Sequence, residues 1–347
     1  MARRAKRDDY VNLNPDIGMN QFTPAPAHAD TGGFVRRTLI PLLVALAYAS
    51  FLTSLPIDAF KDRVVYFAYT TTSDVIFYRY LVYDIKAIFA NEPIWLYINV
   101  VLIKFLTPDQ ILQTIIFSSS FLTSFILMRR ENKNLFWIMI FLLVPAIIKN
   151  YIVHLRQGLA IAIFIAGYYS QSRTLKPVLL GITPFIHSSF FFILMMAGIN
   201  YATGIMKFPL WMRITFITVC YVATASLLEV VASGVGARQI LEYQGAAIDV
   251  SGVGFVFWTC VFLLFLSSGV IFLRQHTLPA SLLAFYLGTY FIVPFAARIL
   301  ESGLFLILIC GLAMQGWRKA AFLTMLILFI LMTYYFQSNE PWLGWAA

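Results

Sequence analysis

The chain has 347 residues, of which 60% are hydrophobic and 12% are charged. A soluble globular domain carries about 25% charged residues, so this composition excludes a soluble protein and indicates one that crosses a membrane several times. The formal net charge is +9. The positive residues cluster at the N-terminus and in short loops, which is typical of membrane orientation and excludes nucleic acid as the expected partner.

The N-terminal residues 1–35 are polar and lack an apolar core, so we expect a flexible cytoplasmic tail rather than a signal peptide. Residues 36–347 are predicted to form a single polytopic membrane domain. Apolar runs in a bilayer must be helical, because unpaired backbone groups are too costly there. The runs fall near 38–55, 94–106, 110–128, 135–149, 151–170, 177–199, 209–231, 252–273, 281–297, 299–315 and 319–336. We therefore predict an all-α polytopic membrane protein with about nine to eleven transmembrane or re-entrant helices.

The basic loops predict the orientation, because Lys and Arg favour the cytoplasmic side. If they all lie there, the outer connections are 56–93, 149–157, 232–251 and the turn around Arg298. This arrangement requires the short run 94–106 to be interfacial or re-entrant. It also requires 177–199 to be a hairpin or a helix broken near His187. A plain span at 177–199 is the alternative, and it would reverse the side of every later loop.

Residues 154–160, His-Leu-Arg-Gln-Gly-Leu-Ala, place an arginine at the mouth of an apolar helix. Such an arginine is costly unless it has a partner or a task. The small residues Gly158, Ala162 and Ala166 follow at intervals of four, which predicts a closely packed neighbouring helix. We therefore expect this helix to lie inside the bundle, with its polar start lining a cavity.

Arg156 is the principal candidate for substrate binding, since a planar guanidinium can hold two phosphate oxygens at once. His154 and Gln157 lie beside it and are candidates for the same role. The alternative is that Arg156 anchors the helix at the lipid headgroups.

A second polar interruption, Ile186-His187-Ser188-Ser189, lies in another apolar run. His187 is a candidate proton shuttle or a hydrogen-bond donor to a pyrophosphate or sugar; the alternative is a histidine bonded to a backbone carbonyl at a helix break. Arg298 is a candidate substrate contact, although Glu301, three residues later, offers it an internal ion pair. Arg238, in another predicted outer connection, joins the candidate substrate-binding residues.

The predicted outer loop 56–93 contains two further candidates for catalysis. Asp74 and Tyr78 share one face if their segment is helical, and Glu92 precedes a proline that can start the next helix. Either Asp74 or Glu92 can act as a general base on a sugar hydroxyl, with Tyr78 as a substrate contact; solvated loop charge is the alternative. The sequence has no nucleotide-phosphate loop, no His-Glu-x-x-His motif and no Asp-x-Asp pair, so we expect no cofactor and no metal.

Taken together, these motifs resemble the EpsG/Wzy-type polysaccharide polymerases of bacterial membranes. The resemblance rests on residues 153–162 and on Ile186-His187-Ser188-Ser189, with further similarity at Asp74, Tyr78 and Glu92-Pro93. It implies a GT-C-like helical bundle and a metal-independent membrane glycosyltransferase that joins repeat units carried on undecaprenyl pyrophosphate, to build O-antigen, capsule or exopolysaccharide. It also implies a location in the inner membrane with the active site facing the periplasm or exterior.

The resemblance assigns roles as well. Arg156 and His187 would contact the donor pyrophosphate with help from Gln157, and Asp74 or Glu92 would be the base. The implied partners are lipid-linked oligosaccharides and membrane lipids, and a chain-length regulator is a candidate partner. Two alternative functions remain open: an O-antigen ligase, and a flippase or transporter of lipid-linked sugars, which would also need intramembrane arginines and broken helices.

Overall fold

The computed structural model describes residues 35–83, 88–89, 91–209, 211–212, 215–216, 219 and 252–346. The predicted N-terminal tail, except for Val35, lies outside these residues. So do the predicted outer connection 232–251 and its candidate Arg238.

The described part of the chain is built from helices and short helical turns, with an isolated β-bridge between Phe60 and Ala346. Within it, three helical segments are long and apolar enough to cross a membrane: Val35–Ser54, Pro108–Arg130 and Gly316–Gln337. Two bent pairs, Asn132–Leu142 with Pro145–Ile152 and Ala296–Ser302 with Leu304–Ala313, raise the number to five if each pair is one span. The predicted all-α polytopic membrane fold is confirmed.

Several predicted runs are divided into shorter helices because proline or glycine interrupts them. The first bent pair turns by 73° before Pro145, and the second turns by 58° at Gly303. Proline removes a backbone donor and glycine weakens a helix interior, so both favour a break at these positions. A further five apolar helices of 10–17 residues are present among the residues described.

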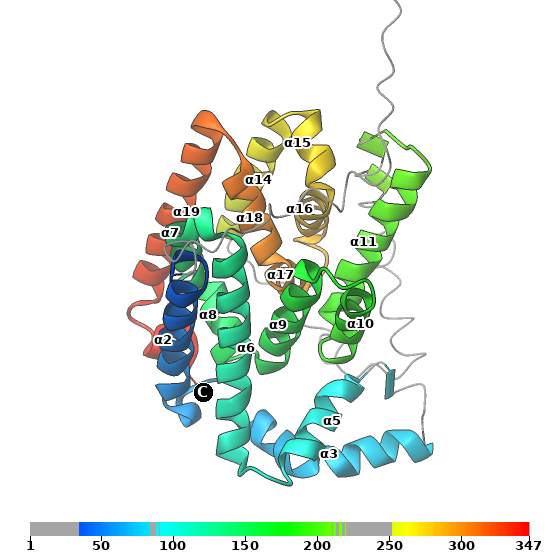
Figure 1. Cartoon of the computed structure of the whole chain (residues 1–347), viewed down its shortest axis with the longest axis vertical. Helices are drawn as coiled ribbons and strands as arrows, with labels where there is room; N and C mark the ends of the chain where they lie inside the picture. The colour runs from blue at the N-terminus through cyan, green and yellow to red at the C-terminus, as the bar shows by residue number, and fades with distance from the viewer. Residues whose placement is uncertain are drawn as a thin grey trace, which may run out of the picture.

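Figure 1 shows how the helices are arranged. α2 (Ile40–Ser54) and α9 (Leu155–Tyr169) pack against the long α6 (Pro108–Arg130), and α3 (Arg63–Tyr83) lies across the lower end of the bundle with α5 (Pro93–Leu102) packed on it. The remaining helices are α7 (Leu135–Leu142), α8 (Pro145–Ile152), α10 (Leu175–Ile182), α11 (Ser189–Ile205), α14 (Val253–Ser267), α15 (Val270–Gln275), α16 (Thr277–Thr289), α17 (Ala296–Ser302), α18 (Leu304–Ala313) and α19 (Gly316–Gln337).

Two of the predicted irregular segments are short or broken in the structure. α5 has ten residues and is about 15 Å long, which is half of the hydrocarbon thickness of a bilayer. The run 177–199 is divided: α10 ends at Ile182, a 3₁₀ turn covers Thr183–Phe185, and α11 begins at Ser189. The structure therefore has the broken helix at His187 and not the uninterrupted span.

The small-residue face of α9 packs closely against α8. A Cβ atom added to Gly158 would lie 2.3 Å from the backbone oxygen of Asn150, so the two helices approach as closely as they do only because residue 158 is glycine. Ala162, one turn later, is completely buried. The predicted position of α9 inside the bundle is confirmed, and it places the start of this helix next to α3 and α5.

Candidate active site

A buried carboxylate, Glu92, lies at the centre of the site. Its side chain is 2% exposed; Oε2 accepts a hydrogen bond from Nη1 of Arg156 at 2.6 Å, and Oε1 lies 2.9 Å from Nδ1 of His187. The backbone amide of Ser188 donates to the same Oε1 at 3.1 Å. Three segments that are distant in sequence meet here: the start of α5, the start of α9 and the break before α11.

The backbone of Glu92 is in the left-handed region, with φ +56° and ψ 58°. This conformation is uncommon for residues other than glycine, and a following proline normally favours extended backbone instead. Strain of this kind persists where the surrounding contacts over-determine it, and it concentrates at functional sites. The contacts to both carboxylate oxygens supply that constraint and hold Glu92 in place before Pro93.

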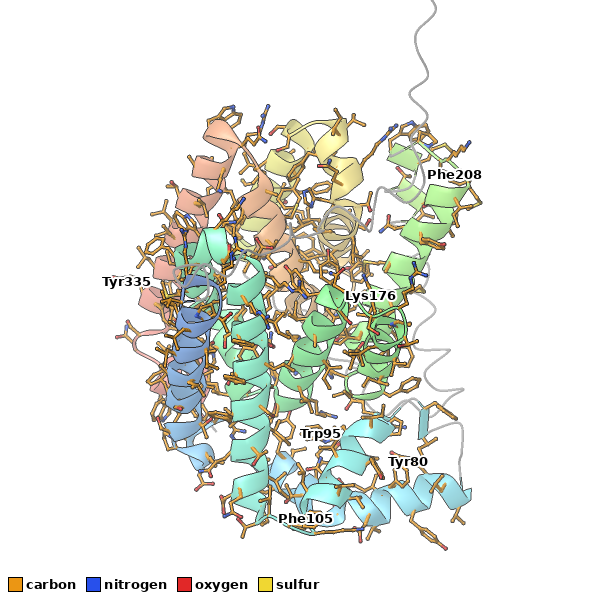
Figure 2. The ribbon with its side chains drawn as sticks, in the orientation of Figure 1. Tyr80, Trp95, Phe105, Lys176, Phe208 and Tyr335 are labelled. Atoms are coloured by element: carbon orange, nitrogen blue, oxygen red, sulfur yellow. The ribbon has the colours of Figure 1, made fainter. Side chains whose placement is uncertain are left out.

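Arg156 is held on one edge by Glu92 and on its faces by aromatic rings. Its guanidinium carbon lies 5.4 Å from the ring centroid of Tyr69 and 5.9 Å from that of Tyr66, both on α3. Trp95 of α5 packs edge-on against both tyrosines and is fully buried where α5 meets the bundle (Figure 2). The side chain of Arg156 retains 18% exposure, so the guanidinium is oriented by the tyrosine rings and stays partly accessible.

His187 presents one ring nitrogen to Glu92 and keeps the other unpaired. Because a carboxylate accepts hydrogen bonds, Nδ1 carries the proton and donates to it. Nε2 is buried and has no hydrogen-bond partner. Most buried polar atoms in native proteins are hydrogen-bonded, so an unpaired ring nitrogen beside the partly exposed Arg156 indicates where a polar ligand would bind.

Gln157 connects the start of α9 to α17 and α11. Its Nε2 donates to the backbone oxygen of Arg298 at 2.9 Å and to Oγ of Ser302 at 3.0 Å, and that hydroxyl lies 2.7 Å from Oγ of Ser189. Arg298 is half-buried, and its positive charge acts on His154. The structure therefore brings Gln157 and Arg298 into the neighbourhood of the cluster.

His154 pairs with an acidic residue that the sequence did not single out. Its Nδ1 lies 3.6 Å from Oδ2 of Asp62, just before α3. Burial lowers the pKa of His154 to about 4, and the charges of Lys149 and Arg298 act in the same direction, so the imidazole is neutral at neutral pH. The pKa of Asp62 is lowered by its contact with His154 and by the charges of Arg298 and Arg156.

The sequence profile of the EpsG family matches residues 41–341, which include every residue of this cluster. The chain belongs to the EpsG family. It matches no curated protein and no solved structure. The resemblance carried by the two polar interruptions is confirmed, and membership of the EpsG family supports a polysaccharide polymerase of the glycosyltransferase type.

Two of the candidates in this EpsG-family protein lie away from the cluster. Asp74 and Tyr78 do share a face of α3, but both side chains are exposed. Oδ1 of Asp74 accepts a hydrogen bond from the backbone amide of Val75, the next residue. In the described parts of the chain no three His, Cys, Asp or Glu side chains are grouped so as to hold a metal ion.

Sequence reasoning missed Asp62 and Arg63. Arg63, the first residue of α3, is 3% exposed, and its Nη2 donates to the backbone oxygen of Ile152, two residues before His154. A polar residue inside an apolar run is unusual and can be recognised in the sequence as a candidate site residue. A charged residue in an amphipathic loop is common, so the sequence does not distinguish it from a solvated surface charge. In the structure the guanidinium carbon of Arg63 lies 5.6 Å from the ring centroid of Phe60.

Proposed function

We propose that this EpsG-family protein polymerises oligosaccharide repeat units carried on undecaprenyl pyrophosphate, at the outer face of the bacterial inner membrane. Arg156 and His187 bind the donor pyrophosphate, and Glu92 holds both of them in position. One observation carries the proposal: a buried carboxylate joins an arginine and a histidine whose second ring nitrogen is buried and unpartnered.

The reaction needs positive charge where the leaving group departs. A hydroxyl of the acceptor sugar attacks the anomeric carbon of the donor glycan, a new C–O bond forms, and the bond to the pyrophosphate oxygen breaks. The hydroxyl proton passes to a base, and the lipid pyrophosphate leaves with the bonding electrons. Donors fixed in advance around the departing oxygens stabilise this transition state without reorganisation.

Glu92 acts in this scheme as a positioning residue. Its two oxygens already accept from Arg156, His187 and the amide of Ser188, so it has little capacity left for a substrate proton. By fixing one edge of the guanidinium it leaves the partly exposed remainder of Arg156 for phosphate oxygens.

The protonation of His187 would also adapt to an anion, because Arg156 and His187 share the single carboxylate of Glu92. A bound pyrophosphate would draw a proton onto Nε2 of His187, which then donates to the anion while Nδ1 continues to donate to Glu92.

The outer location rests on the basic loops. Arg129 and Arg130 end α6, and Arg173 lies between α9 and α10, whereas the cluster lies at the opposite end of α9. Since arginine-rich loops stay on the cytoplasmic side, the start of α9 and its cluster face outward.

The test is elongation by the purified protein in lipid nanodiscs. The substrate is lipid-linked repeat unit extracted from cells in which the gene is deleted. We expect longer lipid-linked glycans and release of undecaprenyl pyrophosphate. Movement of the substrate across the membrane without new glycosidic bonds would indicate a flippase, and transfer only to an added lipid A core would indicate a ligase; either result would overturn the proposal.

A further inference from the structure

The loop that carries Asp62 is fixed from both sides by contacts with distant parts of the chain. On one side, the amide of Lys61 donates to the backbone oxygen of Trp345 at 2.8 Å, and its Nζ donates to that of Gly344 at 3.0 Å. Phe60 forms an isolated β-bridge with Ala346. The C-terminal segment after α19 therefore clamps the residues just before Asp62.

On the other side, the buried Arg63 ties the loop to the end of α8. Its Nη2 donates to the backbone oxygen of Ile152, while Nε and Nη1 are buried and have no hydrogen-bond partner. This contact sets the distance between the start of α3 and the start of α9. It thereby brings Asp62 to His154, two residues after Ile152.

Asp62 itself has a left-handed backbone, with φ +65°. Aspartate and asparagine tolerate this region better than most residues, but it is still uncommon outside glycine. With Lys61 and Arg63 both anchored, the strained residue between them is held in place, as is usual for functional positions.

Asp62 is accessible, unlike the buried carboxylates of the cluster. Its side chain is 46% exposed, whereas Glu92 is buried with both oxygens occupied and Oε2 of Glu301 is buried. Asp74 is exposed but lies outside the cluster. Among the carboxylates that the structure describes, Asp62 combines exposure with electrostatic coupling to Arg156 and Arg298.

We propose that Asp62 is the catalytic base of the polymerase reaction: its carboxylate takes the proton of the acceptor sugar hydroxyl as that oxygen attacks the anomeric carbon. This inference rests on the proposed function. The new C–O bond forms, the bond to the donor pyrophosphate breaks, and the proton ends on Asp62, from which water removes it. A carboxylate removes a proton from an attacking water in the same way in inverting glycoside hydrolases.

His154 is the positioning residue for this base. Its imidazole is neutral, and Nδ1 lies 3.6 Å from Oδ2 of Asp62, so His154 orients that oxygen and leaves Oδ1 for the hydroxyl. The contact with His154 and the positive charges of Arg298 and Arg156 lower the pKa of Asp62 and keep its carboxylate ionised. Asp62 is therefore deprotonated and able to accept a proton at any pH near neutrality. The acceptor sugar binds on the accessible side of the loop that carries Asp62.

The test compares elongation with lipid binding in the full-length protein in nanodiscs. Asp62→Asn keeps the size of the side chain and tolerates the left-handed backbone. We expect it to lower kcat for elongation by about 10²–10⁴-fold, the usual contribution of a general base, and to leave binding of undecaprenyl pyrophosphate unchanged. Asp58→Asn, an exposed aspartate in the same loop, is the matched control and should elongate at the wild-type rate.

Chemical rescue separates a base from a structural residue. Added formate should restore part of the elongation rate of Asp62→Ala, because a free carboxylate can enter the vacated space and take the proton. His154→Asn, whose amide nitrogen can replace Nδ1 as a donor, should keep most of the activity that His154→Ala loses.

Three outcomes would overturn the inference. The first is wild-type elongation by Asp62→Asn. The second is loss of both elongation and lipid binding in Asp62→Asn together with no rescue of Asp62→Ala by formate, which would assign Asp62 a structural role. The third is a wild-type protein that does not elongate at all, which refutes the proposed function and this base with it; the first two leave the proposed function standing.

Discussion

Glu92→Gln should destabilise the protein strongly although it changes few atoms. The substitution keeps the shape of the side chain and one acceptor oxygen, so the amide of Ser188 keeps its partner. It removes the negative charge that compensates Arg156 and places an amide nitrogen against a guanidinium that can only donate.

The magnitude follows from the burial of the pair. Removing one partner of a buried ion pair costs about 3–5 kcal/mol, because the remaining charge is left without compensation. Arg156 retains 18% exposure, and some solvent screening is therefore available, which favours the lower end, about 3 kcal/mol. Removing both charges in Glu92→Gln/Arg156→Gln should cost less than the sum of the single changes, with a coupling of about 2 kcal/mol.

The measurement is the free energy of unfolding in detergent, followed by tryptophan fluorescence. Asp74→Asn is the matched control, since it neutralises an exposed carboxylate on α3 and should change stability by less than about 0.5 kcal/mol. If Glu92→Gln were as stable as Asp74→Asn, the buried ion pair would not exist as described and the geometry of the site would be refuted.

Three other predictions test the packing, the orientation and the protonation of His154. Gly158→Ala should lower the midpoint of thermal unfolding far more than Gly198→Ala, because a Cβ at 158 meets a backbone oxygen of α8 at 2.3 Å and one at 198 meets nothing within 4 Å; equal effects would contradict the close helix contact. A cysteine replacing Asp58 should react with an impermeant thiol reagent in intact cells and one replacing Arg173 should not; the reverse pattern would place the site on the cytoplasmic side. The pKa of His154 falls from 6.5 in the unfolded chain to about 4 in the folded protein, so protonation of this side chain favours unfolding. The stability that the neutral imidazole contributes is therefore complete above pH 6.5 and is lost as the pH falls from 6.5 to 4. Over that range wild type should lose about 3 kcal/mol more than His154→Gln in pH-dependent unfolding, and identical pH profiles would refute a buried neutral imidazole.

The residues at the centre of the site were predictable from the sequence because each is out of place in its surroundings. Arg156 and His187 interrupt apolar runs, where polar groups are costly, and Glu92 stands before a proline that begins a helix. What the sequence could not provide is that Arg156 and His187 share Glu92 as a partner. Nothing in their spacing, 64 residues from Glu92 to Arg156 and 95 to His187, indicates that this carboxylate joins the arginine to the histidine.

In the predicted outer loop 56–93, by contrast, the sequence did not identify which residues reach the site. The spacing of Asp74 and Tyr78 correctly places them on one helical face, but periodicity does not tell which face of α3 packs on α5. Tyr66 and Tyr69 of the same helix face Arg156 instead. Asp62 was hidden for a related reason, since its position depends on contacts with Trp345 and Ile152, which lie far along the chain.

The sequence-based prediction of the number of membrane-spanning helices was also limited, because hydropathy does not resolve breaks inside an apolar run. Apolar runs near 135–149 and 299–315 read as continuous, yet the helices inside them bend at Pro145 and Gly303. A run shows that residues are buried in lipid or protein, but its breaks are set by local backbone and by packing against neighbouring helices.

The binding of undecaprenyl pyrophosphate in nanodiscs tests most directly whether Arg156 and its partners hold a lipid-linked pyrophosphate. Wild type is compared with Arg156→Lys and with Arg129→Lys, a change at the exposed end of α6. Losing the planar guanidinium and its charge-assisted hydrogen bonds, worth about 1.5–3 kcal/mol, should raise Kd at least about tenfold in Arg156→Lys and leave it unchanged in Arg129→Lys. Equal Kd values for all three proteins would contradict the assignment of the site.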